Sequence, residues 1–142
     1  MGDILTDELI EGKITTEDIY NMSDDPWSQT QMLCREKQQI IKFLAEYVYR
    51  FKRCKKIMDL GCGLGIWCFF IKNQTFYREI IGIDNSQTAI EKAGKNFSTI
   101  PEISFDVVDC GERGSLMKLK KHSPDVILMS DITWCLIHTI VD

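Results

Sequence analysis

A glycine-rich loop that could hold a polar ligand occurs in the stretch IMDLGCGLGIW, residues 57–67. Gly61 permits a tight turn with positive φ, Gly63 lets a ligand approach the backbone, and Gly65 lets the following helix pack closely. Asp59 lies just before these glycines, and its carboxylate would repel an anionic pyrophosphate while tolerating an ammonium or sulfonium group. The loop therefore favours a ligand that carries positive charge over a phosphate.

The glycine spacing also differs from the fingerprint of dinucleotide-binding proteins. That fingerprint reads GxGxxG or GxGxxA, so its last position is small. The loop here reads GxGxG, and Ile66 occupies the position that should be small. An NAD-dependent oxidoreductase is therefore the weaker alternative, because only the glycine loop and Asp84 support it.

Asp84 and Asp109 end the next two apolar runs, REIIGID and ISFDVVD. Asp84 lies 84 − 61 = 23 residues past the first glycine, and a carboxylate there can accept hydrogen bonds from both hydroxyls of a ribose. Asp109 can accept a hydrogen bond from an exocyclic adenine amine. Either aspartate alone could simply end a strand or cap a helix. Three aspartates and a glycine loop, each close to the end of a successive strand, are better explained by a shared binding site.

Apolar runs of strand length alternate with segments of helix length over the rest of the chain. We expect strands at 55–60, 78–84, 103–109 and 125–131, and helices at or from 64–72, 86–97, 111–122 and 132–142, with Ser86 capping the second helix. A further amphipathic helix is expected from Ser28 to about Arg53. This alternation is typical of a parallel sheet covered by helices on both faces, in which ligands bind outside the carboxyl ends of the strands.

The order of the motifs IMDLGCGLG, IIGIDNS, ISFDVVDC and PDVILMSDI resembles motifs I to IV of class I S-adenosylmethionine-dependent methyltransferases, over residues from about 55 to 135. The resemblance implies an α/β fold, a Rossmann-like parallel sheet with helices on both faces, and S-adenosylmethionine as the cofactor. It also implies roles for individual residues: Asp59, Gly61, Cys62 and Gly63 surround the methionyl part, Asp84 holds the ribose, Asn85 lies beside the adenine, Asp109 and Cys110 read the adenine edge, and Ser130 faces the sulfonium end.

A finer resemblance links SDDPW, REKQQIIKFL and LMSDITWCLI to bacterial small-molecule methyltransferases of the nodulation N-methyltransferase type. It implies that Trp27 and Lys37 close over the carboxylate end of the cofactor, and that Asp131 and Trp134 lie near the acceptor. Two departures stand against it. The helix has Met-Leu-Cys at 32–34 where an aromatic residue is usual, and Lys37 replaces an arginine that would bind a carboxylate bidentately.

The sequence ends at Asp142, shortly after the fourth expected strand, whereas a complete class I domain has seven strands. We therefore expect a sheet truncated after the fourth strand, with that strand as an exposed edge. The expected organisation is an acidic segment at 1–25, loosely ordered or forming a short helix, followed by an incomplete methyltransferase domain at 26–142. A truncated chain, a half-domain completed by a partner or dimer, and a degenerate protein remain open.

Composition restricts the environment and the partners that we expect. The chain has 142 residues, no apolar run of about 20 residues, and no secretory signal pattern, so we expect a cytoplasmic protein with reduced cysteines. The two histidines, His122 and His138, lack metal-ligand spacing, so no metal is expected. Residues 1–25 carry eight acids and one lysine, while the remainder has 16 basic and 13 acidic residues, which is too mild an excess for a nucleic-acid surface.

The function expected from these features is methyl transfer from S-adenosylmethionine to a small-molecule acceptor by in-line displacement at nitrogen or oxygen, for instance on a sugar or another metabolite. Asp131 is the candidate base if the acceptor must lose a proton. The alternative is a non-catalytic cofactor-binding or interaction subunit that a partner or a second copy completes. We expect no nucleic-acid or membrane partner.

Overall fold

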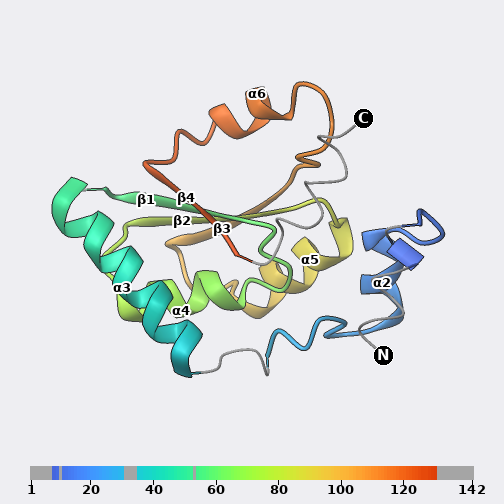
Figure 1. The fold of residues 1–142 in the computed structure, drawn as a ribbon, viewed down its shortest axis with the longest axis horizontal. Helices are drawn as coiled ribbons and strands as arrows, with labels where there is room; N and C mark the ends of the chain where they lie inside the picture. Colours follow the sequence, from blue (N-terminus) through green and yellow to red (C-terminus); the bar gives the residue numbers. More distant parts are fainter. Residues whose placement is uncertain (1–7, 10, 31–34, 53, 131–142) are drawn as a thin grey trace.

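The computed structural model describes residues 8–9, 11–30, 35–52 and 54–130 (Figure 1). The helices are α2 (Thr16–Met22), α3 (Arg35–Lys52), α4 (Ile66–Gln74), α5 (Gln87–Asn96) and α6 (Ser115–Lys120). The strands are β1 (Lys56–Leu60), β2 (Glu79–Asp84), β3 (Ile103–Val107) and β4 (Val126–Met129). None of the helices described has the length and apolar composition needed to cross a membrane.

The four strands form one parallel sheet in the order β3-β2-β1-β4. Because all the strands run in one direction, their carboxyl ends, and the residues that follow, meet at the same edge. The expected Rossmann-like arrangement is therefore confirmed over the described residues. β1 lies between β2 and β4, which places the glycine loop after a central strand.

The strand residues alternate between two apolar layers, one on each face of the sheet. Ile57, Ile80 and Ile103 face a core that includes Ile41 of α3 and Ile71 of α4. The opposite face carries a second cluster, which consists of Met58, Leu60, Ile81, Ile83, Val108 and Leu119 of α6. Figure 1 accordingly shows α3, α4 and α5 on one side of the sheet and α6 on the other. The expectation of helices on both faces is confirmed.

Several elements have boundaries that differ from those expected; the helix expected at 111–122, for example, is α6 at Ser115–Lys120. The helix expected from Ser28 does not include residues 28–30, because Ser28 has a positive φ of 50° and the Asp25 carboxylate accepts the backbone N–H groups of Gln29 and Thr30 in a turn. The structure describes this helix as α3 from Arg35. The third strand ends at Val107 rather than Asp109. By contrast, the expected helix cap is confirmed, since the Ser86 side chain accepts a hydrogen bond from Ala89 N–H at 3.0 Å. The helix expected from residue 132 lies outside the described residues.

Within the acidic first 25 residues, Thr16–Met22 form α2. Thr15 and Asp18 make a reciprocal capping box at its start, which satisfies backbone N–H groups that the helix leaves free. Ile19 and Tyr20 on this helix are 0% and 2% exposed, so they belong to the core. The acidic segment is therefore partly an element of the fold, and Figure 1 shows α2 beside α5.

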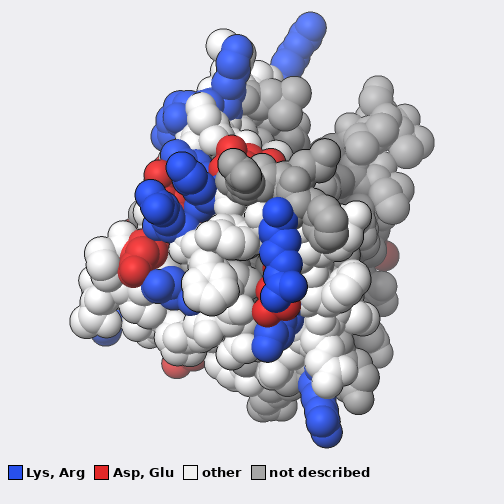
Figure 2. Space-filling model, turned by 90° about the vertical axis from the view of Figure 1, so that its left-hand side faces the viewer, with Lys and Arg blue, Asp and Glu red and all other residues white. Residues whose placement is uncertain are grey.

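Arg50, Lys55 and Arg78, near the end of α3 and the starts of β1 and β2, lie at the opposite end of the strands from the glycine loop. Figure 2 shows this side, where lysine and arginine side chains gather around the place at which α3 ends and β1 and β2 begin. An open hollow of about 290 Å³ there is lined by Tyr49, Arg50, Lys55, Phe76 and Arg78. These cations are therefore not part of the candidate site at the carboxyl ends of the strands.

Candidate functional site

Backbone hydrogen bonds hold the start of the glycine loop against the end of β2. The N–H groups of Gly61 and Cys62 both donate to Ile83 O, at 2.7 and 2.9 Å. Gly61, Gly63 and Gly65 have φ values of 76°, 53° and 75°, a region that residues with a side chain rarely adopt. The tight turn expected at Gly61 is therefore present, and glycine is needed at all three positions.

The space over Gly63 is filled by the protein itself. A Cβ at Gly63 would lie 2.4 and 2.5 Å from the side-chain amide atoms of Gln29 and 2.5 Å from Tyr20 Oη. The sequence predicts that a ligand uses this close approach, but in the structure two side chains from the N-terminal part of the chain use it. At Gly65 a Cβ would lie 2.7 Å from the ring of Phe105, so that ring, rather than the following helix, makes the closest approach.

Asp84 ties the end of β2 to the glycine loop. Its Oδ2 accepts Gly63 N–H at 2.8 Å and its Oδ1 accepts Ser86 N–H at 3.0 Å. Asp84 is 7% exposed, and this burial raises its pKa above the ordinary value, although the backbone N–H donors oppose the rise. Each carboxylate oxygen can accept a second hydrogen bond, so Asp84 retains capacity for ribose hydroxyls.

The side chains of Asp59 and Cys62 are buried inside the protein. Asp59 is 1% exposed, and its Oδ2 lies 3.6 Å from Sγ of Cys68 on α4. Cys62 is also 1% exposed, and its Sγ would lie 2.8 Å from a Cβ added at Gly82, in the middle of β2. Burial raises the pKa of the Cys62 thiol well above its ordinary value. Because the side chains of Asp59 and Cys62 are both buried, a ligand at the loop would contact Cys62 mainly through its backbone.

Asn85, Asp109 and Cys110 lie at the same edge, next to Asp84. Val108 N–H donates to the backbone oxygen of Asp84 at 2.9 Å, which brings the ends of β2 and β3 together. Asp109 is exposed and its Oδ1 accepts Gly111 N–H at 2.8 Å. Burial raises the pKa of Cys110, and the charges of Asp109 and Asp84 add to that rise. The structure therefore brings the predicted ribose and adenine residues to one place.

The remaining predicted residues are placed less completely. Trp27 packs against the cluster of Tyr20, Leu64 and Ala89, beside the glycine loop. Ser130 directly follows β4, at the carboxyl edge of the sheet. Lys37 lies on α3, but its side chain is outside the described part of the chain, as are Asp131 and Trp134 altogether.

Residues 15–30, which we call the strap, also lie at this edge, and sequence reasoning placed only Trp27 of this segment near the cofactor. Gln29 Oε1 accepts Leu64 N–H at 2.8 Å, so the strap takes a backbone donor of the glycine loop. Tyr20 is 2% exposed, and its pKa is raised, first by burial and then by the charge of Asp84. The capping pattern from Thr15 to Asp18 could have indicated a short helix, although no local pattern indicates where that helix docks.

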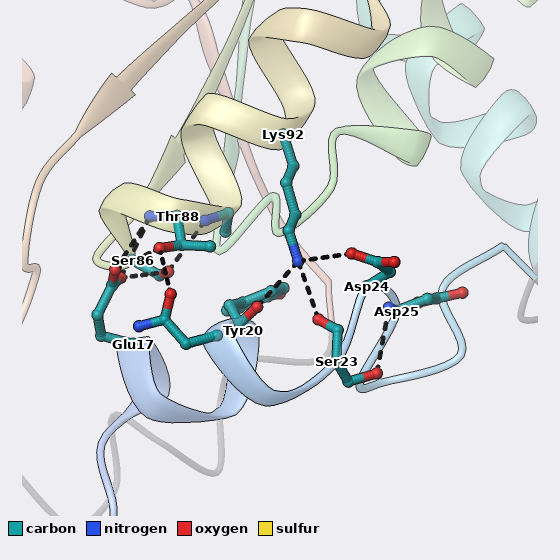
Figure 3. A network of polar contacts seen from close by, with 10 residues as sticks. Glu17, Tyr20, Ser23, Asp24, Asp25, Ser86, Thr88 and Lys92 are labelled. Carbon is teal, nitrogen blue, oxygen red and sulfur yellow. Dashed lines mark hydrogen bonds and ion pairs between the residues drawn. The ribbon is translucent and has the colours of Figure 1, made fainter.

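Two charged side chains connect the strap to α5 (Figure 3). Glu17 accepts hydrogen bonds from Ser86 Oγ at 2.6 Å and from Thr88 N–H and Oγ1, and these bonds lower its pKa. Lys92 Nζ donates to Tyr20 O at 2.9 Å and Ser23 O at 3.0 Å and pairs with Asp24 at 3.1 Å. Each charge thus lies at the end of the other helix where the backbone dipole favours it.

Comparisons of the sequence and of the structure with known proteins both find methyltransferases. A family model described as a methyltransferase domain matches residues 57–140, that is 84 of 142 residues. A solved structure of a proposed caffeoyl-CoA O-methyltransferase from Staphylococcus aureus has a TM-score of 0.53 and 16% identity, with 89% of this chain and 58% of that chain covered. This likeness concerns the fold.

Two other solved structures are more similar in sequence but overlap less. One is an S-adenosylmethionine-dependent methyltransferase from Anabaena variabilis, with 25% identity, a TM-score of 0.47, and 62% of this chain and 37% of that chain covered. The other is the methyltransferase domain of bacterial CtHen1, with 25% identity, a TM-score of 0.45, and 54% and 43% covered. The chain thus spans less than two thirds of each of these proteins. No curated protein matches the sequence.

Proposed function

Because the chain belongs to the methyltransferase domain family, we propose that it binds S-adenosylmethionine at the carboxyl ends of β1, β2 and β3 and takes part in methyl transfer. The observation that carries this proposal is Asp84, a buried carboxylate at the end of β2 that is hydrogen-bonded to Gly63 of the glycine loop. A ligand held there by its ribose would place its remaining parts along the loop and toward Asp109. The glycine loop, Asp84 and Asp109 come from separate parts of the sequence, and the parallel sheet brings them to the same ends of its strands.

Bound S-adenosylmethionine supplies an electrophilic methyl group on a sulfonium, and the protein's task is to align an acceptor with it. Such alignment is worth up to about 7–11 kcal/mol in well-organised sites. The Asp84 carboxylate would orient the ribose, and the loop backbone would hold the methionyl end. We propose a small-molecule acceptor that is methylated at nitrogen or oxygen, with Asp131 as base where a proton must leave. The similarity of SDDPW and LMSDITWCLI to small-molecule methyltransferases supports this part.

The environment and partners belong to the same proposal. Cys54, Cys62, Cys68 and Cys110 are free thiols among the described residues, which supports a reducing, cytoplasmic location. Ile127 and Met129 of β4 are 49% and 44% exposed over the described residues, which supports a homodimer or a complementing subunit at this side of the sheet. If such a subunit supplies the acceptor site, the isolated chain binds the cofactor without turning it over.

The test is calorimetric titration of the purified chain with S-adenosylhomocysteine, with NAD as the matched control. We expect micromolar affinity for S-adenosylhomocysteine and none for NAD, because Asp59 and the loop's spacing disfavour a pyrophosphate. Tight NAD binding with no S-adenosylhomocysteine binding would instead support an oxidoreductase. A folded chain that binds neither ligand would refute the proposed cofactor site.

The pH dependence of this affinity is a further expectation. Ribose hydroxyls donate to Asp84 only while it is ionised, and its pKa is raised by burial. Affinity should therefore fall with acidification at a pH above the usual aspartate value of about 3.9. The stability contribution of this group has the opposite sign: a carboxyl whose pKa is raised on folding stabilises below its unfolded pKa and loses that effect as pH rises through its folded pKa.

Titrations at a series of pH values, with melting curves on the same samples, measure both quantities. An affinity that stays constant through the mildly acidic range while the fold is intact would contradict a role for ionised Asp84 in ribose binding. A cofactor site that used only backbone groups would give this flat profile.

A further inference from the structure

The strap contacts the proposed cofactor site at four neighbouring places. Tyr20 and Gln29 lie over Gly63, and Gln29 also accepts Leu64 N–H. Further along the same edge, Asn85 Nδ2 donates to Thr16 Oγ1 at 3.4 Å, and Ser86 Oγ donates to Glu17. The strap therefore covers the loop and the start of α5, on either side of Asp84.

The space over the loop leaves no room for a ligand that touches Gly63 from this side. Even one added carbon would lie 2.4–2.5 Å from Gln29 and Tyr20, far inside van der Waals contact. Leu64 N–H, which a carboxylate ligand could otherwise use, is already bonded to the Gln29 amide. Polar side chains of the strap thus occupy the space over Gly63 and the N–H group of Leu64.

The strap is held by anchors that are separate from the loop. Glu17 bonds to Ser86 and Thr88, and Lys92 bonds to the carboxyl end of α2 (Figure 3). These bonds run between α2 and α5, so each anchor can be weakened by a substitution outside the loop. The charge of Glu17 also raises the pKa of Asp84, whereas Lys92 is not among the groups that shift it, so the Lys92 variant separates loss of the anchor from a change at Asp84. Ile19 and Tyr20 add buried apolar area to the same contact.

We propose that the strap is an internal ligand of the glycine loop, competing with S-adenosylmethionine for the backbone at Gly63 and Leu64, so that it must leave this position before the cofactor seats. The inference rests on the proposed cofactor site. Its physical consequence is quantitative, because the apparent affinity and association rate scale with the fraction of molecules whose strap is displaced. Weakening the anchors raises that fraction and therefore strengthens cofactor binding.

The opposite arrangement is a strap that forms part of the pocket wall and improves binding. The two arrangements predict opposite signs for the same substitutions. If the strap is a pocket wall, loosening it lowers the affinity for the cofactor. If the strap is a competitor, loosening it raises that affinity. The experiment therefore depends on the direction of the change.

The experiment uses Glu17→Gln and Lys92→Met in the full chain, with Glu91→Gln and Lys95→Met on α5 as matched controls. Association of S-adenosylhomocysteine is followed by stopped-flow tryptophan fluorescence, and the dissociation constant by calorimetry. Losing a hydrogen-bonded charge should raise the displaced fraction up to about tenfold, so we expect association and affinity to increase up to about tenfold. The two control variants should behave like the unchanged chain.

Hydrogen exchange at the Leu64 amide reports whether the strap has loosened, and it should accelerate in both anchor variants. Unchanged exchange and unchanged association would overturn the inference, and so would weaker, slower binding with faster exchange. If neither the unchanged chain nor any variant binds S-adenosylhomocysteine, the proposed function fails and the inference with it. Normal binding by the unchanged chain with no increase in the anchor variants rejects the strap as competitor but leaves the cofactor site standing.

Discussion

Replacing Asp84 with asparagine should lower the affinity for S-adenosylhomocysteine about 100-fold. Asp84 is the buried carboxylate between the glycine loop and α5, and it is the group that we assign to the ribose hydroxyls. A hydrogen bond to a charged group is worth about 1.5–3 kcal/mol, and the asparagine amide replaces one accepting oxygen with a donor. A loss of about 2.7 kcal/mol corresponds to the 100-fold change. Calorimetric titration of both proteins measures it.

The control is Asp106→Asn on β3. Asp106 is beside Ile83 in the sheet, but its carboxylate pairs with Lys121 at 2.6 Å and with His122 at 2.9 Å, just after α6, so its loss should leave cofactor affinity unchanged. Asp84→Asn also disturbs bonds to Gly63 and Ser86, so melting curves must show that the variant is folded. A folded Asp84→Asn variant that keeps full affinity would show that Asp84 stabilises the loop but does not bind the ribose.

The largest stability effect is expected at Gly82, in the middle of β2. A Cβ there would lie 2.5 and 2.7 Å from ring atoms of Phe105 and 2.8 Å from Cys62 Sγ. Overpacking of this kind costs about 1–3 kcal/mol, because neighbouring side chains must leave their preferred rotamers. We expect Gly82→Ala to lower the free energy of unfolding by about 2 kcal/mol and the melting temperature by roughly 5–10 °C. Denaturant titration and calorimetry check these values.

Two companion variants separate the clash from a general effect of removing glycine. Gly94→Ala on α5 meets no atom within 4 Å, so it should stabilise the protein by about 0.5–1 kcal/mol through helix propensity. Combining Gly82→Ala with Phe105→Leu should cost less than the sum of the two single changes, since the ring causes the clash. Strictly additive costs would show that Phe105 is not the obstacle.

The sheet and the position of Asp84 could be predicted from the sequence because they depend on local patterns. Apolar runs separated by helix-length segments define parallel strands, and an aspartate at the end of such a run must lie at the binding edge. The ends of elements were harder to predict, because they depend on single side chains. Residues 28–30 were wrongly assigned to the helix, because the Asp25 carboxylate holds Gln29 and Thr30 in a turn.

What fills the space around the glycines could not be predicted in this way. A sequence indicates that Gly63 and Gly65 can adopt positive φ, but not which side chain approaches them. In the structure these neighbours are Gln29 and Tyr20 at one glycine and Phe105 at the other. They come from distant parts of the chain, so only the folded arrangement reveals them. The contacts of Tyr20 and Gln29 in the strap were missed for the same reason, although Trp27 of the strap was predicted to lie near the cofactor.

The position of the strap in the chain has a consequence for the protein's synthesis. Its partners on α5 lie 69–72 residues further along, so the strap leaves the ribosome long before they exist. At about 5–20 residues per second, it waits roughly 4–14 s with Ile19 and Tyr20 uncovered. Eight acidic residues among the first 25 repel other chains during that interval. The acidity of residues 1–25 is therefore expected to limit association of the nascent chain while the strap waits for α5.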